Sequence, residues 1–523
     1  MKPRIKRIGR YFFIGLSLLV ISGFLVSWAV TLPGVQTWLV KKGRWYLERK
    51  IGTPVELTAV KVGLPMDAVL EGVRIDDEQG EALLAIDAVR LHLFNFSLLN
   101  YLFQKEEAAP EDLIVSDVKL ESPRLFLYKR SKDGVLNLQY LVDAFRGNQE
   151  KKPGGRKLRL DLTGVTVQKG QFIYRDSTVG PDIRPQIGRI NFRNLQLDSL
   201  DAHVSALIVP DGLWDIQLTS FSGLESGSQF QLDQFSCSIL AEPESELDSK
   251  PRVVFDDISF RHQNTWVRAK MIFPDRSFPQ VFSFDDDWHY LATLAPDCRI
   301  DMQTVSYLVE DTLPLRGAFT LDGDLRGTLK RVKSNNILVS YGKDTRLQLN
   351  LDVNRLDLGS NAPFRVKMRP SNISFVELQE IIPQVKLPRL LTDLDQLEVL
   401  GLVEGTARDM DLNVRLNADV GAFGADVSLT LPPVTPELTY DGFISSEQLN
   451  INALSLGDLR PSENLTMEAR VRGSGSSLET LQLEMEGGLR NSDLYGYLVD
   501  TARADFVFRD QQLKGTFFIA DPE

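Results

Sequence analysis

The stretch LQLNLDV, residues 347–353, alternates apolar and polar side chains without a break. Successive side chains of a β-strand point to opposite faces of the sheet, so this pattern predicts a strand with one apolar and one polar face. The same period of two returns in stretches that turn residues separate: 158–162, 214–218, 347–353, 412–418, 427–431, 465–471 and 481–485. These repeats predict an antiparallel sheet of many strands.

Helices are expected to be few among these strands, and the best candidates are residues 302–309 and 375–382. Parallel βαβ units need helical segments of about 10–15 residues between their strands, and the sequence lacks them. We therefore predict a mostly β fold. It would consist of an N-terminal transmembrane helix followed by a long, curled antiparallel sheet with few short helices.

The apolar face of such a sheet has to be covered by other apolar groups. A second sheet would give a closed sandwich. Curling of one sheet would instead give a taco-like β-groove with an apolar lining. The length of 523 residues favours the groove, because about 30 strands would fit into it and open sheets rarely exceed about 10 strands without curling or splitting. Strands stacked in series at about 4.8 Å would form an elongated object.

Residues 11–30 contain no charged side chain, and no other part of the sequence has a comparable apolar run. A helix of about 20 residues crosses a bilayer core, so this run predicts a membrane anchor. The anchor would include Tyr11, Phe12, Leu19, Phe24, Trp28 and Val30. A cleaved signal peptide with a site at residues 27–29 is the alternative, but the long run and the bulky Trp28 favour retention.

Basic residues flank the anchor on both sides. Five precede it (Lys2, Arg4, Lys6, Arg7 and Arg10), and three follow it within a short distance (Lys41, Lys42 and Arg44). The denser cluster lies in front, so we expect a cytoplasmic N-terminus with the bulk of the chain across the membrane.

Changes of composition divide the chain into segments. Residues 1–33 form the basic tail and anchor, and residues 34–52 predict an amphipathic helix that lies on the membrane surface, covers the first strands, or does both. Residues 53–148 form a first β segment. The charged run QEKKPGGRK, residues 149–157, predicts a linker. Residues 158–523 would form the repetitive β-groove.

The composition excludes several classes of protein. A net charge of -12 argues against a nucleic-acid partner, which would demand clustered Lys and Arg. Cys237 and Cys298 fit no zinc spacing; they form one bridge or serve as small apolar residues in a sheet. The four histidines lack metal-ligand spacing, and neither HExxH nor GxSxG occurs. We therefore expect no enzyme, no cofactor and no metal.

Several short patterns recur in a characteristic order behind the anchor. They are LEGVRIDD at 70–77, VKLESPRL at 118–125 with DGVLNL at 133–138, GQFIYRD at 170–176, LDGDLRG at 321–327, and LKG at 513–515 leading to IAD at 519–521. In this order the sequence resembles the TamB/AsmA-like family, the translocation and assembly module proteins of bacterial envelopes.

The resemblance implies an inner-membrane anchor and a long periplasmic β-groove. It also implies transport of phospholipid acyl chains toward the outer membrane, or help with outer-membrane protein assembly and secretion, with an outer-membrane barrel as a partner. Members of the TamB type are usually longer, so the sequence is expected to be an N-terminal portion.

Two hypotheses for the function follow. The first is a lipid conduit whose floor is a continuous apolar stripe rather than a site. Its candidate lining residues are Leu158, Leu160, Leu162, Leu347, Leu349, Leu351, Leu412, Val414, Leu416, Leu465 and Met467. The second is a structural or chaperone-like tether, in which the apolar faces close as sandwiches and exposed sheet edges pair with client strands.

Overall fold

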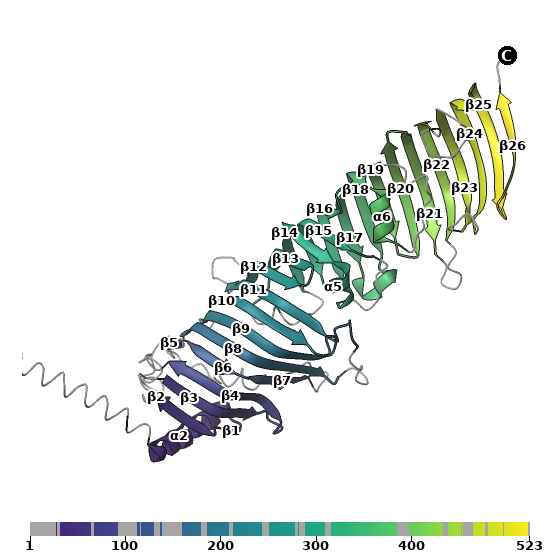
Figure 1. The fold of residues 1–523 in the computed structure, drawn as a ribbon. Helices are drawn as coiled ribbons and strands as arrows, with labels where there is room; N and C mark the ends of the chain where they lie inside the picture. Colours follow the sequence, from purple (N-terminus) through teal and green to yellow (C-terminus); the bar gives the residue numbers. More distant parts are fainter. Residues whose placement is uncertain are drawn as a thin grey trace, which may run out of the picture. The chain divides into compact units, whose positions relative to one another are not determined.

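The structure is a computed structural model. It describes residues 28, 32–63, 67–92, 112–115, 117–129, 136–138, 159–178, 186–208, 213–242, 250–277, 281, 288–308, 315–383, 397–431, 438–450, 452, 464–475, 480–494 and 496–520. The chain divides into two compact units, Met1–Pro251 and Arg252–Glu523. Strands dominate the described residues of both units (Figure 1), so the predicted mostly β fold is confirmed.

The first unit opens with helix α2 (Pro33–Ile51), which begins with a proline and ends at Gly52 in the left-handed conformation. Proline is favoured in the first helical turn and glycine just past the end. Strands β1 (Val55–Glu56), β2 (Ala59–Gly63), β3 (Asp67–Asp76) and β4 (Ala82–His92) follow. Strand β3 pairs antiparallel with the other three.

The middle of this unit departs from the predicted antiparallel sheet. Strands β5 (Asp112–Val115), β6 (Val118–Glu121) and β7 (Arg124–Lys129) all pair in parallel with β8 (Arg159–Asp176). The prediction of a wholly antiparallel sheet is therefore wrong here. Parallel pairing needs a crossover of a dozen or more residues, and residues 130–158 supply that length.

This pairing also bears on the division of the chain. The predicted linker, residues 149–157, lies outside the described residues, but strands before and after it belong to one sheet. The boundary between the two compact units falls in the sequence between Pro251 and Arg252. From β8 the first unit continues antiparallel through β9 (Asn194–Ile208), β10 (Trp214–Glu225) and β11 (Phe230–Glu242).

The second unit is a series of antiparallel strands, each paired with the next in the sequence. They are β12 (Arg252–His262), β13 (Thr265–Pro274), β14 (His289–Asp301), β15 (Ala318–Thr328), β16 (Arg331–Tyr341), β17 (Thr345–Asn354), β18 (Phe364–Ile373), β19 (Leu397–Gly405), β20 (Asp409–Ala418), β21 (Gly421–Thr430), β22 (Thr439–Leu449), β23 (Leu465–Ser474), β24 (Gln482–Leu494), β25 (Tyr497–Arg509) and β26 (Gln512–Ala520). The two helices predicted in this part are present as α5 (Met302–Ser306) and α6 (Phe375–Ile381). A 3-10 helix, η3 (Leu356–Asn361), was not predicted.

Several strands carry β-bulges, where two residues on one strand oppose one on its partner. In β12 the register shifts between Phe255 and Ile258, and Asp257 has a φ of 48°. In β16 it shifts between Ser334 and Ile337. Each shift falls on a pair of polar residues that interrupts the apolar alternation. A bulge bends its strand and increases the local twist, so these positions curve the sheet.

The predicted anchor falls almost entirely outside the described residues. Tyr11, Phe12, Leu19, Phe24 and Val30 are not among them, and Trp28 is described with an exposed side chain. Within the described part of the chain, no helix has both the length and the apolar character to cross a bilayer.

Both cysteines are buried and free. Cys237 lies in β11 of the first unit, where burial raises the pKa of its thiol to about 11. Cys298 lies in β14 of the second unit with no exposed surface. In the structure they therefore do not form a bridge with one another and serve as small apolar residues of a sheet.

Candidate functional site

The apolar residues of β18 to β25 line up from strand to strand. Directly opposite one another, in order, are Val366, Val403, Leu412, Val427, Gly442, Val471, Met485 and Phe506. Directly opposed residues of antiparallel strands share one face of the sheet. These eight residues, here called the apolar row, therefore form an unbroken line on one face of the second unit.

The predicted lining residues of this unit lie on the same face. Leu351 is opposite Val366 and so extends the apolar row, and Leu412 is a member of it. Leu349 begins a parallel line through Met368 and Gly401 to Val414. The structure thus places four of the predicted residues in two neighbouring lines, although their role as a lining stays a prediction.

Most side chains of the apolar row are only half-buried. In a closed sandwich the inner-face residues pack against a second sheet and are excluded from water. Figure 1 shows the strands of the second unit following one another in a single layer. The described residues therefore leave part of this apolar face in contact with solvent.

Helix α6 covers one end of that face. Phe375 from α6 is buried in a cluster with Leu397, Leu449 and Leu465, while Leu416 and Met467 pack against its edge. Leu465 is only 9% exposed. Leu465, one of the predicted lining residues, is thus part of a core beneath α6. The alternation of apolar and polar residues did not predict that α6 covers it. Leu347 lies on β17 and is half-buried.

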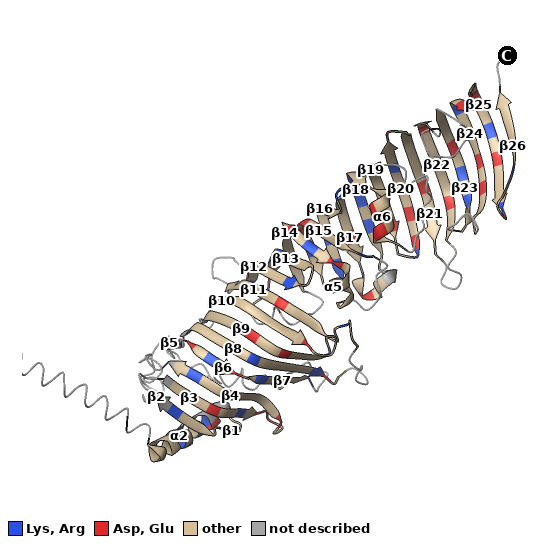
Figure 2. Cartoon of the chain, viewed as in Figure 1, with Lys and Arg blue, Asp and Glu red and all other residues tan. Residues whose placement is uncertain are grey.

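The opposite face of the second unit is charged, and Figure 2 shows acidic and basic residues at positions along its successive strands. Ion pairs join neighbouring strands, among them Arg331 with Asp352 at 2.7 Å and Arg365 with Glu404 at 2.9 Å. The hydrogen bond from Arg331 lowers the pKa of the Asp352 carboxyl. Such exposed pairs contribute at most about 1 kcal/mol each. Their main consequence is that this face belongs in water.

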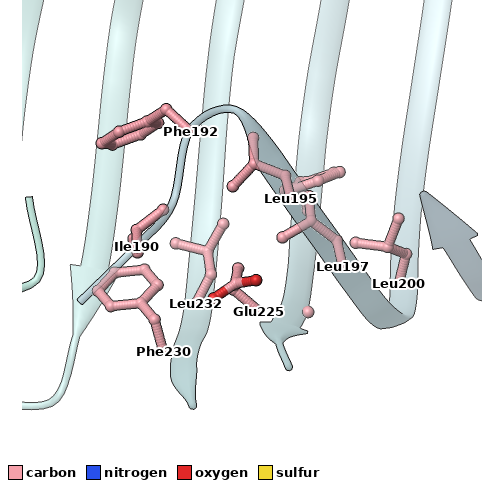
Figure 3. A pocket seen from close by; sticks show the side chains of 10 residues that line it. Ile190, Phe192, Leu195, Leu197, Leu200, Glu225, Phe230 and Leu232 are labelled. Atoms are coloured by element: carbon pink, nitrogen blue, oxygen red, sulfur yellow. The ribbon is translucent and has the colours of Figure 1, made fainter. Parts of the chain in front are cut away.

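The first unit has an apolar pocket at one end of β9, β10 and β11 (Figure 3), with a volume of about 170 Å³. Its lining consists of Ile190, Phe192, Leu195, Leu197, Leu200, Phe221, Gly223, Glu225, Phe230 and Leu232. Alternation along each strand points these side chains to one face, and the segment before β9 adds Ile190 and Phe192. A Cβ on Gly223 would lie 2.5 Å from Cδ2 of Leu200, so the glycine makes room for that leucine.

Glu225 is the one polar residue among the described side chains that line this pocket, and it is 2% exposed. Its carboxylate accepts hydrogen bonds from the backbone N–H of Ser228 at 2.6 Å and of Gly227 at 3.1 Å, and from the Ser228 hydroxyl. These donors belong to the turn between β10 and β11. Glu225 therefore stabilises that turn, and the rest of the pocket is suited to hydrocarbon.

The predicted lining of the first unit lies elsewhere. Leu158 is outside the described residues, and the backbones of Leu160 and Leu162 pair with Ile208 and Ala206 at the other end of β8 and β9. The sequence analysis missed the pocket, although a signal was present. The run NLQL, residues 194–197, has the same period of two, and Gly223 interrupts an apolar strand where close packing needs a small residue.

Among the residues that the structure describes, no group of three or more His, Cys, Asp or Glu side chains is placed to hold a metal ion. What the two apolar surfaces offer is area and shape for an apolar ligand. Comparisons of the chain with protein-family models, with curated proteins and with solved structures found no match.

Proposed function

We propose that this protein binds phospholipid acyl chains along the apolar faces of its sheets and passes them between the inner and outer membranes of a bacterial envelope. The apolar row of the second unit is the observation that carries this proposal. It crosses eight consecutive strands with no charged residue in it. Each methylene kept from water contributes about 0.8 kcal/mol, so an unbroken row lets a chain slide without a large barrier.

The bulges and the half-buried apolar side chains support a curled, open groove rather than a sandwich. Bulges bend the strand that carries them, and an apolar face that is partly exposed to solvent is suited to a ligand that brings its own hydrocarbon. The charged opposite face would stay in water, as would the lipid headgroup. The apolar run at residues 11–30 supports an inner-membrane anchor, with the bulk of the chain in the periplasm.

The test is native mass spectrometry with lipid extraction on the full chain, purified in a mild detergent. We expect phospholipids to co-purify with it. Replacing Leu349 and Leu351 by Asp should remove at least half of them, because carboxylates would interrupt the apolar floor. The matched control carries Gln348→Glu and Asn350→Asp, two negative charges on the opposite face of the same strand, and should retain its lipid.

Retention of lipid by the Leu349→Asp, Leu351→Asp variant, with unchanged circular dichroism, would contradict the conduit. A lipid-free wild-type protein would contradict it as well.

A second candidate function is the tether that pairs sheet edges with client strands. Strand β26 favours it: among the described strands it pairs only with β25, and Phe517, Phe518 and Ile519 on it are 40%, 66% and 54% exposed. Unpaired strand edges accept added strands. A lipid-free protein that binds client peptides, and loses them when proline replaces Thr516, would favour this function over lipid transfer.

A further inference from the structure

Helix α2 has two faces with different surroundings. Val35, Leu39, Val40 and Gly43 lie on one side and are half-buried. A Cβ on Gly43 would lie 3.7 Å from Cδ2 of Leu57, which places this side of the helix against the beginning of the sheet. The first strands therefore account for one face of α2, and the other face is left to solvent.

Two tryptophans occupy that outer face. Trp38 and Trp45 are 52% and 51% exposed, and seven residues apart they lie two helical turns from one another on the same side. The ammonium of Lys42 lies 5.1 Å from the centre of the Trp45 ring, and the guanidinium of Arg49 lies 5.4 Å from it. Packing within the unit does not explain two half-exposed tryptophans, one of which lies beside two cations.

The charge of α2 is predominantly positive. It contains five basic residues, Lys41, Lys42, Arg44, Arg49 and Lys50, and one acidic residue, Glu48. Glu48 is engaged within the fold, since it accepts hydrogen bonds from Arg44 at 2.8 Å and from the backbone N–H of Val55 at 3.4 Å. On the outer face, Lys42 and Arg49 therefore place positive charge beside the Trp45 ring.

We infer that this outer face lies in the headgroup layer of an anionic bilayer. Tryptophan is enriched where membrane meets water, and Lys and Arg on a helix surface add attraction to anionic lipid. The apolar run at residues 11–30 ends just before α2 begins, which brings the helix to the membrane surface. The inference rests on the proposed membrane location, but it does not depend on lipid transfer.

A membrane contact of α2 would also determine where the first strands of the sheet lie. A helix whose inner face packs on the first strands and whose outer face lies in headgroups would hold the first strands of the sheet beside the bilayer. Lipid would then enter the protein next to the membrane that supplies it.

The experiment uses the full chain in proteoliposomes of phosphatidylcholine and phosphatidylglycerol at 7:3. Tryptophan fluorescence is quenched by a shallow doxyl-labelled lipid or by iodide in the buffer. The chain has six tryptophans, so Trp38→Phe with Trp45→Phe isolates the contribution of this face. We expect quenching by the lipid to fall at least twofold in the double variant, and quenching by iodide to stay nearly constant.

The matched control is Trp266→Phe. Trp266 is 40% exposed and lies beneath the guanidinium of Arg299, at 5.6 Å, but it belongs to β13 in the second unit. Its removal should leave quenching by the lipid unchanged. Replacing Lys42 and Arg49 by Glu should reduce that quenching in the anionic vesicles and have little effect in pure phosphatidylcholine.

The opposite pattern would overturn the inference. If iodide quenching, and not lipid quenching, falls in the Trp38→Phe, Trp45→Phe variant, the face lies in water and an acidic protein partner becomes the better occupant. Normal lipid quenching in a protein that carries no groove lipid would instead remove the proposed transfer function and leave the membrane contact standing.

Discussion

Glu377 joins two elements through one carboxylate. It follows Ser374 by three residues, the spacing of a capping box, and the Ser374 hydroxyl accepts a hydrogen bond from the Glu377 N–H at 3.4 Å. The Glu377 carboxylate reaches away from its own helix. It accepts from the backbone N–H of Lys343 at 2.7 Å and of Thr345 at 2.8 Å, in the turn between β16 and β17. The residue therefore fixes α6 to that turn.

The substitution Glu377→Gln tests this connection. Burial raises the pKa of the Glu377 carboxyl, but hydrogen bonds from Thr345, Lys343 and Asp344 outweigh it and hold that pKa below its ordinary value. The ionised form thus stabilises the fold above the unfolded pKa of about 4.3, and this contribution is lost as pH falls through the folded pKa. We expect Glu377→Gln to cost about 1–2 kcal/mol of local stability, and to remove the acid sensitivity of amide protection at residues 342–346.

Hydrogen exchange with mass spectrometry, corrected for intrinsic rates, measures this protection. The control is Glu380→Gln on the same helix, whose carboxylate accepts a long hydrogen bond of 3.4 Å from the Tyr341 hydroxyl. Equal protection in the Glu377→Gln protein and the wild type at neutral pH would show that the connection does not stabilise the turn.

Strands differ in how they tolerate a change of length. Strand β20 pairs with β19 and β21 without any register shift, so its apolar and polar residues alternate strictly. Strand β12 contains a bulge at Asp257, after which the apolar alternation resumes on the same face. A one-residue slip in a regular strand moves every following side chain to the opposite face.

Inserting one serine after Asn413 should therefore move Val414 and Leu416 to the polar face of β20. We expect a loss on the order of 4 kcal/mol or more, seen as loss of exchange protection across β19 to β21. Deleting Asp257 removes the extra residue of the bulge and keeps Phe255 and Ile258 on one face, so its cost should be much smaller. Similar losses from both changes would argue that register does not determine the stability of these strands.

At the scale of the whole molecule, each unit has an apolar surface of its own. The first unit has the pocket of about 170 Å³, and the second has the apolar row. The two are made by different strands and share no residue. If both bind hydrocarbon, the lipid content of the protein is a sum over two independent surfaces.

Charges placed in each surface should then act additively. We expect Leu232→Asp in the pocket and Phe506→Asp in the apolar row each to remove part of the lipid that mass spectrometry finds after extraction, and the double variant to remove more. The controls are their neighbours on the opposite faces, Gln231→Asp and Val507→Asp. Loss of all lipid from either single variant would contradict independent binding.

The sequence by itself determined the strands and the short helices. The alternation at 347–353 and 412–418 corresponds to β17 and β20, and the helices predicted at 302–309 and 375–382 are α5 and α6. A period of two is a local property of the chain, so it can be read without knowing what the segment packs against.

Only the tertiary structure decided which strands are neighbours and what covers their faces. The parallel pairing of β5 to β7 with β8, the burial of Leu465 beneath α6, and the pocket under Phe192 all join residues far apart in the sequence. Alternation gives a strand two faces, but it does not select the partner, the register or the covering element. Those depend on hydrogen bonds and packing between distant segments, for which a single strand's sequence holds no signal.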